Sequence, residues 1–517
     1  MSPDQSAVTS PPSSAFETVA RTGSNVWTWI ILWAIALAVR VPAALLLPNA
    51  EQDGYSYAET IAWLSANFSH LRFKDLFGFW LPLFQVTAAT LNVWIDDPLL
   101  AGKILSSVCG AGSCVLVFAI TKKLTQNLAL ACVTFALILC SPLHLLYSAA
   151  CMTDVPHVCL VLASLWFVLD ERWLGAAIFA ALAESVRIEA WALVLLLPLL
   201  QFVRQRRVSP IVLGILLFPP VAWLVISYIA TGDLFSYFSE RARYHEQYLD
   251  FYPTRHGFAW ADIKIDIDYF LLGANRTVSL SAIIAMGLLV LPAIRRPRRV
   301  NWLATVVTSY ILALLGFLLF AYITKRQPVI LPRYSLVFFA LGLPLFAWLL
   351  QLLFDNLRGR LLAVCLAGLA VALSLADWQR QIPIVFKVLD DFRAHEQVSR
   401  KIASEFQESS DRNARCFSDD VAVRVLSGLP PARFVRSAIA PAAAWQNVGA
   451  FESYLREQNV AYLVFTRIEA SLPAKFYPAL GRTPQMDVSG FQFISFASSS
   501  FGPDVWLYRS NTVEQSR

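Results

Sequence analysis

Several carboxylates and guanidinium groups stand at the ends of apolar runs in this sequence. Asp53 follows the run 27–47, Asp154 precedes another run, and Arg333 opens a late one. A carboxylate can accept a proton from an attacking hydroxyl or amine. Arginine presents a planar fork of donors that suits a phosphate. Together these residue types suggest a reaction in which a proton is removed while negative charge builds on a phosphate.

Each of these positions also has an ordinary structural role open to it. Lys103 could extend along its helix to the membrane surface, and Arg187 with Glu189 could form a simple ion pair. Asp154 could cap the helix that follows it, and His157 could be packed in the core. A functional interpretation therefore depends on whether these residues meet on one side of the membrane.

Composition sets the class of protein. The chain has 517 residues, of which 57% are hydrophobic and 15% charged, with 16 Trp and 35 Phe. One soluble core could not bury so much apolar surface, so we expect a polytopic helical membrane protein. The net charge of +6 is concentrated in short loops, which indicates membrane orientation and not nucleic-acid binding. The 8 cysteines show neither a disulfide framework nor metal-ligand spacing.

The apolar runs predict about eleven membrane spans. They cover residues 27–47, 98–121, 127–143, 155–169, 173–184, 189–203, 210–230, 278–294, 301–322, 331–354 and 359–376. Basic residues occur in alternate loops: Lys122, Lys123, Arg172, Arg204, Arg206, Arg207, Arg295, Arg296, Arg298, Arg299, Arg358 and Arg360. Under the positive-inside rule these loops are cytoplasmic. The N-terminus is then inside, and an odd number of spans places the C-terminal region outside.

Two apolar segments need a separate interpretation. Residues 80–94 contain Pro82 and are short for a crossing of about 20 residues, so we expect an interfacial helix. Residues 173–203 have arginines at both ends and Arg187 and Glu189 in the middle. We expect a helical hairpin whose charged tip reaches a wet cavity. The segment after Asp53, with apolar side chains at i, i+4 and i+7, is expected to form an amphipathic helix on the membrane surface.

The domain organisation follows from these patterns. We expect a disordered cytoplasmic tail (1–26), a transmembrane domain (27–376) with outward loops 48–97 and 231–277, and an extracytoplasmic α/β domain (377–517). In the last domain, helical patterns near 391–407 and 446–458 alternate with strand-like runs 461–466, 491–496 and 505–508.

The short motifs, taken in order, resemble those of a known family. They are Gln-Asp53-Gly-Tyr-Ser-Tyr, Phe-Trp-Leu-Pro82-Leu-Phe, Ala-Gly-Lys103-Ile-Leu-Ser-Ser, Met-Thr-Asp154-Val-Pro, Val-Arg187-Ile-Glu and Leu-Pro-Arg333-Tyr. This order resembles the GT-C fold membrane glycosyltransferases, above all the branch of protein O-mannosyltransferases and lipid A aminoarabinose transferases. Two departures concern the acceptor and any metal. The first motif reads Asp-Gly where the mannosyltransferases carry Asp-Glu, and a second acidic pair like that of the metal-dependent oligosaccharyltransferases is missing.

The resemblance implies an inverting glycosyltransferase that moves a sugar from a polyprenyl-phosphate donor to a lipid, glycan or protein acceptor. The site would face outward from a bacterial inner membrane. Asp53 would be the general base, and Asp154 would share that role or orient the acceptor. The other candidate residues are Arg333, Arg187, Lys103 and Lys325 for the donor phosphate, and Tyr55, Glu189, His157, Tyr334, Arg243, Tyr244 and His245 for substrate.

We expect no cofactor, and the sequence gives no support for a divalent metal. The partners are then the donor, the acceptor and membrane lipids, without nucleic acid. The main alternative is a transporter or flippase of an amphiphilic substrate. Transporters place functional charges near mid-membrane in paired broken helices, whereas the charges here gather at one leaflet. A scaffold protein is a third possibility, but it leaves the carboxylates and arginines without a role.

Overall fold

The computed structural model describes residues 26–78, 80–239, 263–264, 267, 275–295, 301–324, 331–356, 360–408, 413–437, 440–466, 472–477, 490–497 and 505–510. The expected N-terminal tail lies outside these residues, apart from its last position. Lys325 and the loop residues Arg243, Tyr244 and His245 also lie outside them, as do most of the basic residues of loop 295–299.

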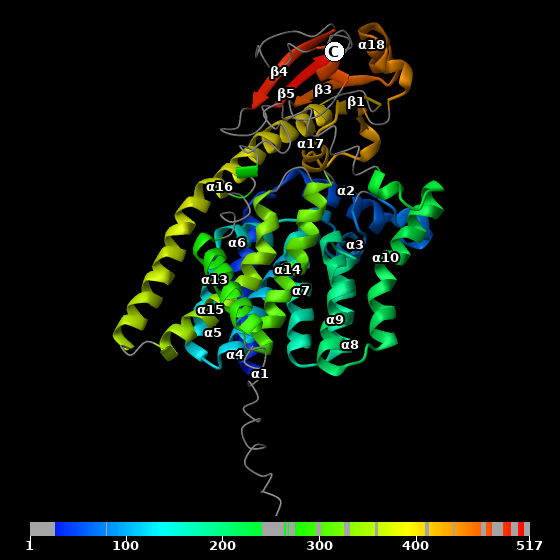
Figure 1. The fold of residues 1–517 in the computed structure, drawn as a ribbon. Helices are drawn as coiled ribbons and strands as arrows, with labels where there is room; N and C mark the ends of the chain where they lie inside the picture. Colours follow the sequence, from blue (N-terminus) through cyan, green and yellow to red (C-terminus); the bar gives the residue numbers. More distant parts are fainter. Residues whose placement is uncertain are drawn as a thin grey trace, which may run out of the picture.

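The chain folds into a bundle of helices with a small sheet at one end (Figure 1). The bundle helices are α1 (Val26–Leu46), α2 (Gln52–Asn67), α3 (Leu83–Ile95), α4 (Pro98–Thr125), α5 (Leu128–Cys140), α6 (Pro142–Ser148), α7 (Asp154–Leu169), α8 (Trp173–Glu184), α9 (Leu193–Gln205), α10 (Pro210–Thr231), α13 (Arg276–Arg295), α14 (Trp302–Ile323) and α15 (Ser335–Asn356). Short 3-10 turns η1 (Phe68–His70), η2 (Phe73–Leu76), η3 (Ile188–Ala192) and η5 (Pro332–Tyr334) connect them.

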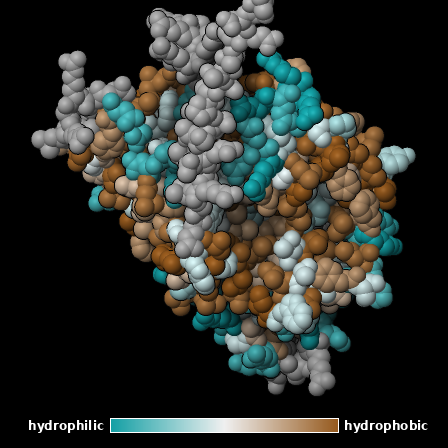
Figure 2. All heavy atoms as spheres, turned by 90° about the horizontal axis from the view of Figure 1, so that it is seen from below, coloured by the Kyte–Doolittle hydropathy of each residue, from teal (hydrophilic) through white to brown (hydrophobic). Residues whose placement is uncertain are grey.

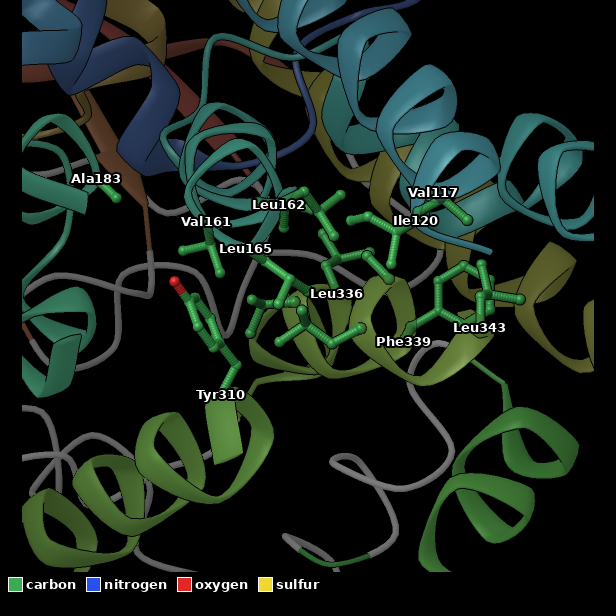
Figure 3. Packing of buried hydrophobic residues seen from close by; sticks show 14 of the residues in the cluster. Val117, Ile120, Val161, Leu162, Leu165, Ala183, Tyr310, Leu336, Phe339 and Leu343 are labelled. Carbon is green, nitrogen blue, oxygen red and sulfur yellow. The ribbon is translucent and has the colours of Figure 1, made fainter. Parts of the chain in front are cut away.

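The centre of the bundle is closely packed. Figure 3 shows side chains of α4, α7, α14 and α15 meeting in one hydrophobic cluster. On α15, Leu336, Phe339 and Leu343 recur at i, i+3 and i+7 and are almost fully buried, which is the spacing of one helix face. The hydroxyl groups of Ser164 and Tyr310 lie 2.8 Å apart in this apolar setting, so each has a hydrogen-bond partner there.

The outer surface of the bundle is apolar. Figure 2, a view from below, shows hydrophobic residues over much of the visible surface, and large side chains such as Leu195 and Phe218 are exposed. By length and composition, six helices of the described residues can cross a membrane, or seven if α5 and α6, bent by 61°, count as one span. The protein is therefore an integral membrane protein. The finer count of about eleven spans stays a prediction.

Two local expectations match the described structure. Residues 80–94 contain most of a 13-residue helix, α3, with Pro82 at its N-cap; its place at the membrane interface stays a prediction. The hairpin between residues 173 and 203 is present as α8 and α9, separated by η3 with Arg187 at its N-cap. The helix after Asp53 is also present, as α2, but Tyr57, Ile61 and Leu64 are buried. It therefore lies beneath other elements and not on an open membrane surface.

The small sheet has five strands in the order β2-β1-β3-β5-β4. They are β1 (Arg415–Ser418), β2 (Phe434–Val435), β3 (Val460–Thr466), β4 (Phe491–Ala497) and β5 (Val505–Ser510), with helices α17 (Val421–Leu426), α18 (Val448–Glu457) and α19 (Leu472–Phe476) and the turns η6 (Pro431–Arg433) and η8 (Ala442–Trp445). β1 is parallel to β2 and β3, whereas β5 is antiparallel to β3 and β4. Three of these strands match the predicted runs.

Both faces of the sheet are covered. In β3, Leu463 and Phe465 share a hydrophobic cluster with side chains of α18, while Tyr462 and Val464 share one with side chains of the long helix α16 (Arg360–Glu408). Successive residues of a strand point to opposite faces, so this alternation explains why all seven residues of β3 are buried. The sheet is thus the centre of a helix–sheet–helix sandwich.

Helix α16 connects the bundle to this sandwich. It has 49 residues and rises alongside the bundle to pass under the sheet (Figure 1). The predicted domain boundary at residues 376–377 falls inside it. The loss of hydrophobicity after residue 376 is real, but it marks a change in the surroundings of one helix and not the end of that helix. At its far end Glu405 pairs with Lys401 at 3.2 Å and with Arg509 of β5.

Candidate functional site

Arg333 is the centre of a cluster of charges at the sheet end of the bundle. It sits in η5, immediately before α15, with Pro332 as the first residue of the turn. One of its terminal nitrogens lies 2.7 Å from Asp53 and the other 3.1 Å from Glu51. These partners precede it by 280 and 282 residues. The tertiary fold therefore brings together an arginine and two carboxylates that the sequence keeps far apart.

Arg187 forms a second set of ion pairs beside the first. Its guanidinium lies 2.7 Å from Asp154 and 2.8 Å from Glu189, and its side chain is only 12% exposed. Tyr334 joins the two sets, because its ring lies 5.1 Å from the Arg187 guanidinium and 5.9 Å from that of Arg333. Such distances allow cation–π attraction. The two arginines are thus held near each other by an aromatic ring and four carboxylates.

A cavity opens between these residues. It contains about 370 Å³ of empty space, open solvent included. Its polar wall carries Arg187, Arg333, Asp154, Glu189, His157 and Tyr334, and its apolar wall carries Val158, Leu314, Leu318, Val337 and Phe338. A ligand with a charged group and an apolar chain would find a matching wall for each part.

Helix α2 explains how Asp53 and Glu51 reach Arg333, which lines this cavity. Glu51 is its N-cap residue, and Asp53 lies in its first turn. Tyr57, four residues after Asp53, lies on the same face and places its hydroxyl 3.3 Å from that of Thr153, next to Asp154. The aromatic rings of Trp80 and Phe84 pack against Tyr57 at 4.7 and 5.6 Å. This face of the helix is therefore fixed against the bundle.

Glu51 is held by two donors. Besides Arg333, the hydroxyl of Tyr147 in α6 donates a hydrogen bond to its carboxylate. Burial raises the pKa of Glu51 above its usual value, and the nearby Asp53 adds to this, although Arg333 and Tyr147 oppose the rise. Burial disfavours the charged form of a carboxyl group. Glu51 is therefore protonated more readily than an ordinary glutamate as pH falls.

Some polar atoms of the cluster make no hydrogen bond within the described residues. They are the Nε of Arg333, the Oδ2 of Asp154 and the Nε2 of His157, all buried. Buried polar atoms usually have partners, so these three atoms are well suited to bind a ligand. Within the described residues, no group of three or more His, Cys, Asp or Glu side chains could hold a metal ion.

The structure places two predicted site residues away from the cavity. The ammonium of Lys103 lies 2.7 Å from the carbonyl oxygen of Leu47 and 3.2 Å from that of Ala44. It thus caps the C-terminal end of α1, where a cation is favoured. Tyr55 is 1% exposed and packs with Val421 of the sheet domain. Its position two residues after Asp53 turns it by about 200° around the helix, away from the cavity.

Four residues of the cluster were not predicted as site residues: Glu51, Tyr147, Tyr57 and Thr153. The first of these had an available signal. Glu51 is two residues before Asp53 in the segment that leaves the first span, so both carboxylates could reach one cation. The other three have no distinctive local pattern, and only the tertiary fold brings them to the cluster.

Comparisons with known proteins gave matches in structure alone. No family model matches the sequence, and no curated protein sequence matches it. Two solved structures of ArnT from Cupriavidus metallidurans are similar in fold. The one bound to undecaprenyl phosphate has a TM-score of 0.56 and 14% identity, over 94% of this chain and 98% of that chain. The apo one has a TM-score of 0.52 and 13% identity, over 93% and 98%.

At this level of identity the likeness concerns the fold. It extends over nearly the whole of both chains, so it includes the helical bundle and the sheet domain together. The motifs around Asp53, Lys103, Asp154, Arg187 and Arg333 predicted this fold. The chain has the fold of the ArnT structures, in agreement with the resemblance in its sequence.

Proposed function

We propose that this protein transfers a sugar from a polyprenyl-phosphate donor to an acceptor hydroxyl or amine. The observation that carries this proposal is the cavity with Arg333 and Arg187 on one wall and apolar residues of α14 and α15 on the other. A lipid-linked phosphate has both parts, and it would reach the cavity from the surrounding bilayer. The similar fold of ArnT bound to undecaprenyl phosphate supports the same class of ligand.

In this proposal the donor phosphate competes for Arg333 with Asp53 and Glu51. A guanidinium binds a phosphate through charge-assisted hydrogen bonds. As Arg333 turns its donors to the phosphate, Asp53 loses a positive neighbour and becomes a better base. Donor binding would thus release the base only when the sugar is in place.

The transfer step forms one bond at C1 of the sugar and breaks another. The acceptor oxygen or nitrogen attacks C1 of the sugar while Asp53 accepts its proton. The bond between C1 and the phosphate oxygen breaks, and its electron pair leaves with the polyprenyl phosphate. Arg333 and Arg187 stabilise the charge that grows on this leaving group. Attack opposite the phosphate inverts the configuration at C1. Asp154, through Oδ2, would orient the acceptor.

The test is a turnover assay with purified protein. It is incubated with a panel of polyprenyl-phosphate sugars and an extract of envelope lipids and glycans as acceptor, and release of free polyprenyl phosphate is measured. Release with at least one donor supports the proposal. A flippase, the alternative, would move the donor across vesicles without releasing polyprenyl phosphate.

We further propose that the cavity faces outward from a bacterial inner membrane, with the N-terminus in the cytoplasm. In a background without native cysteines, Ser69→Cys next to α2 should react with a membrane-impermeant thiol reagent added outside intact cells. Gln126→Cys, after α4, should react only in opened cells. The reverse pattern would overturn the orientation and leave the reaction class untouched.

A further inference from the structure

The helix that carries Asp53 has a second face, and the sheet domain holds it. Tyr55 and Glu59 are four residues apart on α2 and so share one face. They lie about 200° around the helix from Asp53 and Tyr57. Tyr55 packs with Val421 and Ala422 of α17 in a buried cluster of its own. One face of α2 thus meets Arg333 and Thr153 at the charge cluster, and the other faces the sheet domain.

Glu59 forms the polar part of this contact. Arg424 of α17 approaches its two carboxylate oxygens at 2.7 and 3.2 Å, which is the bidentate geometry that arginine favours with a carboxylate. Arg424 also donates to the backbone oxygens of Ser418 and Asp419 at the end of β1. Its side chain is 10% exposed. This pair therefore sets both the distance and the rotation of α2 relative to α17, which a flexible surface pair would not do.

Helix α17 is itself anchored to α16. Asp420, the N-cap of α17, lies 2.9 Å from Nε2 of His395, and the hydroxyl of Ser399 donates to the backbone oxygen of Val423. His395 and Asp420 are both buried. A connected series of contacts therefore runs from α16 through α17 to α2, and ends within two turns of Asp53.

We infer that Arg424 and Glu59 are positioning residues, through which the sheet domain sets the place of Asp53 and Glu51 opposite Arg333. The inference rests on the proposed function for its catalytic consequence. A helix is rigid over a few turns, so a shift at Glu59 moves Asp53 with it. An error of about 1 Å in the place of a catalytic group can cost on the order of a hundredfold in rate. The sheet domain would then help to position the residues of the active site.

The test uses Arg424→Lys, which keeps the charge but loses the fork. The matched control is Arg400→Lys, which alters an exposed pair with Glu396 on α16. Hydrogen–deuterium exchange of the full-length protein is followed in peptides of residues 52–58 and, for comparison, 460–466. We expect exchange in 52–58 to rise about tenfold in Arg424→Lys, the lower end of the range for losing one charged hydrogen bond, because Glu59 is partly exposed. Exchange in 460–466 should not change, and Arg400→Lys should resemble wild type.

Turnover separates positioning from a general loss of stability. Arg424→Lys should lower kcat several-fold while the donor KM moves less. In the Asp53→Asn background it should cause no further loss, because it acts through Asp53. Equal losses in both backgrounds, or unchanged exchange in 52–58, would overturn the inference. If wild-type protein turns over no donor at all, the proposed function fails, and the exchange result alone still decides whether the sheet domain holds α2.

Discussion

The two ends of the helical bundle both carry ion pairs, but of different kinds. At the sheet end, Arg333 is 9% exposed and pairs with two carboxylates. At the opposite end, Arg204 is 46% exposed and pairs with Glu171. Exposed pairs contribute little because water competes for both charges, whereas a buried charge needs its partners. The exposed pair of Arg204 and Glu171 is thus suited to marking the membrane orientation. The buried cluster around Arg333 is suited to holding a ligand.

The largest effect is expected for Asp53→Asn. The amide keeps the shape of the side chain but cannot accept a proton, so turnover should fall by about 10²–10⁴-fold. Donor binding should be retained or tightened, because the amide competes less with the phosphate for Arg333. The measurement is kcat for release of polyprenyl phosphate. The control is Asp75→Asn, which alters the ion pair between Asp75 and Arg72 in the same segment. Turnover near the wild-type level would assign the base to Asp154 or remove it from the mechanism.

A smaller effect is expected for Arg333→Lys. The substitution keeps the positive charge but cannot bind two groups through one planar fork. The loss of one charged hydrogen bond costs about 1.5–3 kcal/mol, so the donor KM should rise about tenfold to a hundredfold. Arg204→Lys at the other end is the control and should leave KM unchanged. An unaltered KM in Arg333→Lys would indicate that Arg187, and not Arg333, binds the donor phosphate.

The ionisation of Glu51 should make the stability of the protein depend on pH. Its pKa in the folded protein lies above the usual value of 4.5, so folded protein keeps this proton where unfolded protein has lost it. Its contribution to stability is then fully present below pH 4.5 and is lost as pH rises through the raised pKa. The melting temperature of wild type should therefore fall relative to Glu51→Gln as pH rises from 4.5. A constant difference between the two proteins would show that Glu51 titrates normally.

The smallest effect is expected at the end away from the sheet. Arg204→Gln removes an exposed pair whose contribution is about 0–1 kcal/mol. Its ring contact with Trp302, at 5.7 Å, adds little in water. Turnover should equal that of wild type, and the melting temperature should fall by a few degrees at most. A loss of turnover comparable to that of Arg333→Lys would remove the distinction between the two ends.

The sequence was informative where a local pattern decides the structure. Hydrophobic periodicity located the helices and three of the five strands, and the α8–α9 hairpin followed from two arginine-bearing ends with charges between them. It was less informative where the environment changes within one element. Helix α16 continues past residue 376 and through Pro383, although its surroundings change from the helical bundle to the sheet domain.

The same limit applies to the candidate site. Asp53, Asp154, Arg187 and Arg333 were predicted as chemically important, and the structure brings them together, which leaves their roles to experiment. Lys103 and Tyr55 lie apart from them, because residue type alone does not show which face of a helix a side chain occupies. The pairing of Arg333 with Glu51 spans 282 residues, a distance at which no local pattern carries information.

The contact between Glu59 and Arg424 has a consequence for how the protein is made. The two residues are separated by 365 positions, so a ribosome adding about 5–20 residues per second finishes the second roughly 20–70 s after the first. During that time α2 has been synthesised, but its outer face has no partner. The helix that carries Asp53 therefore reaches its final position only after α17 has been made and has folded. A nascent or truncated chain would contain Arg333 before Asp53 is in its final place.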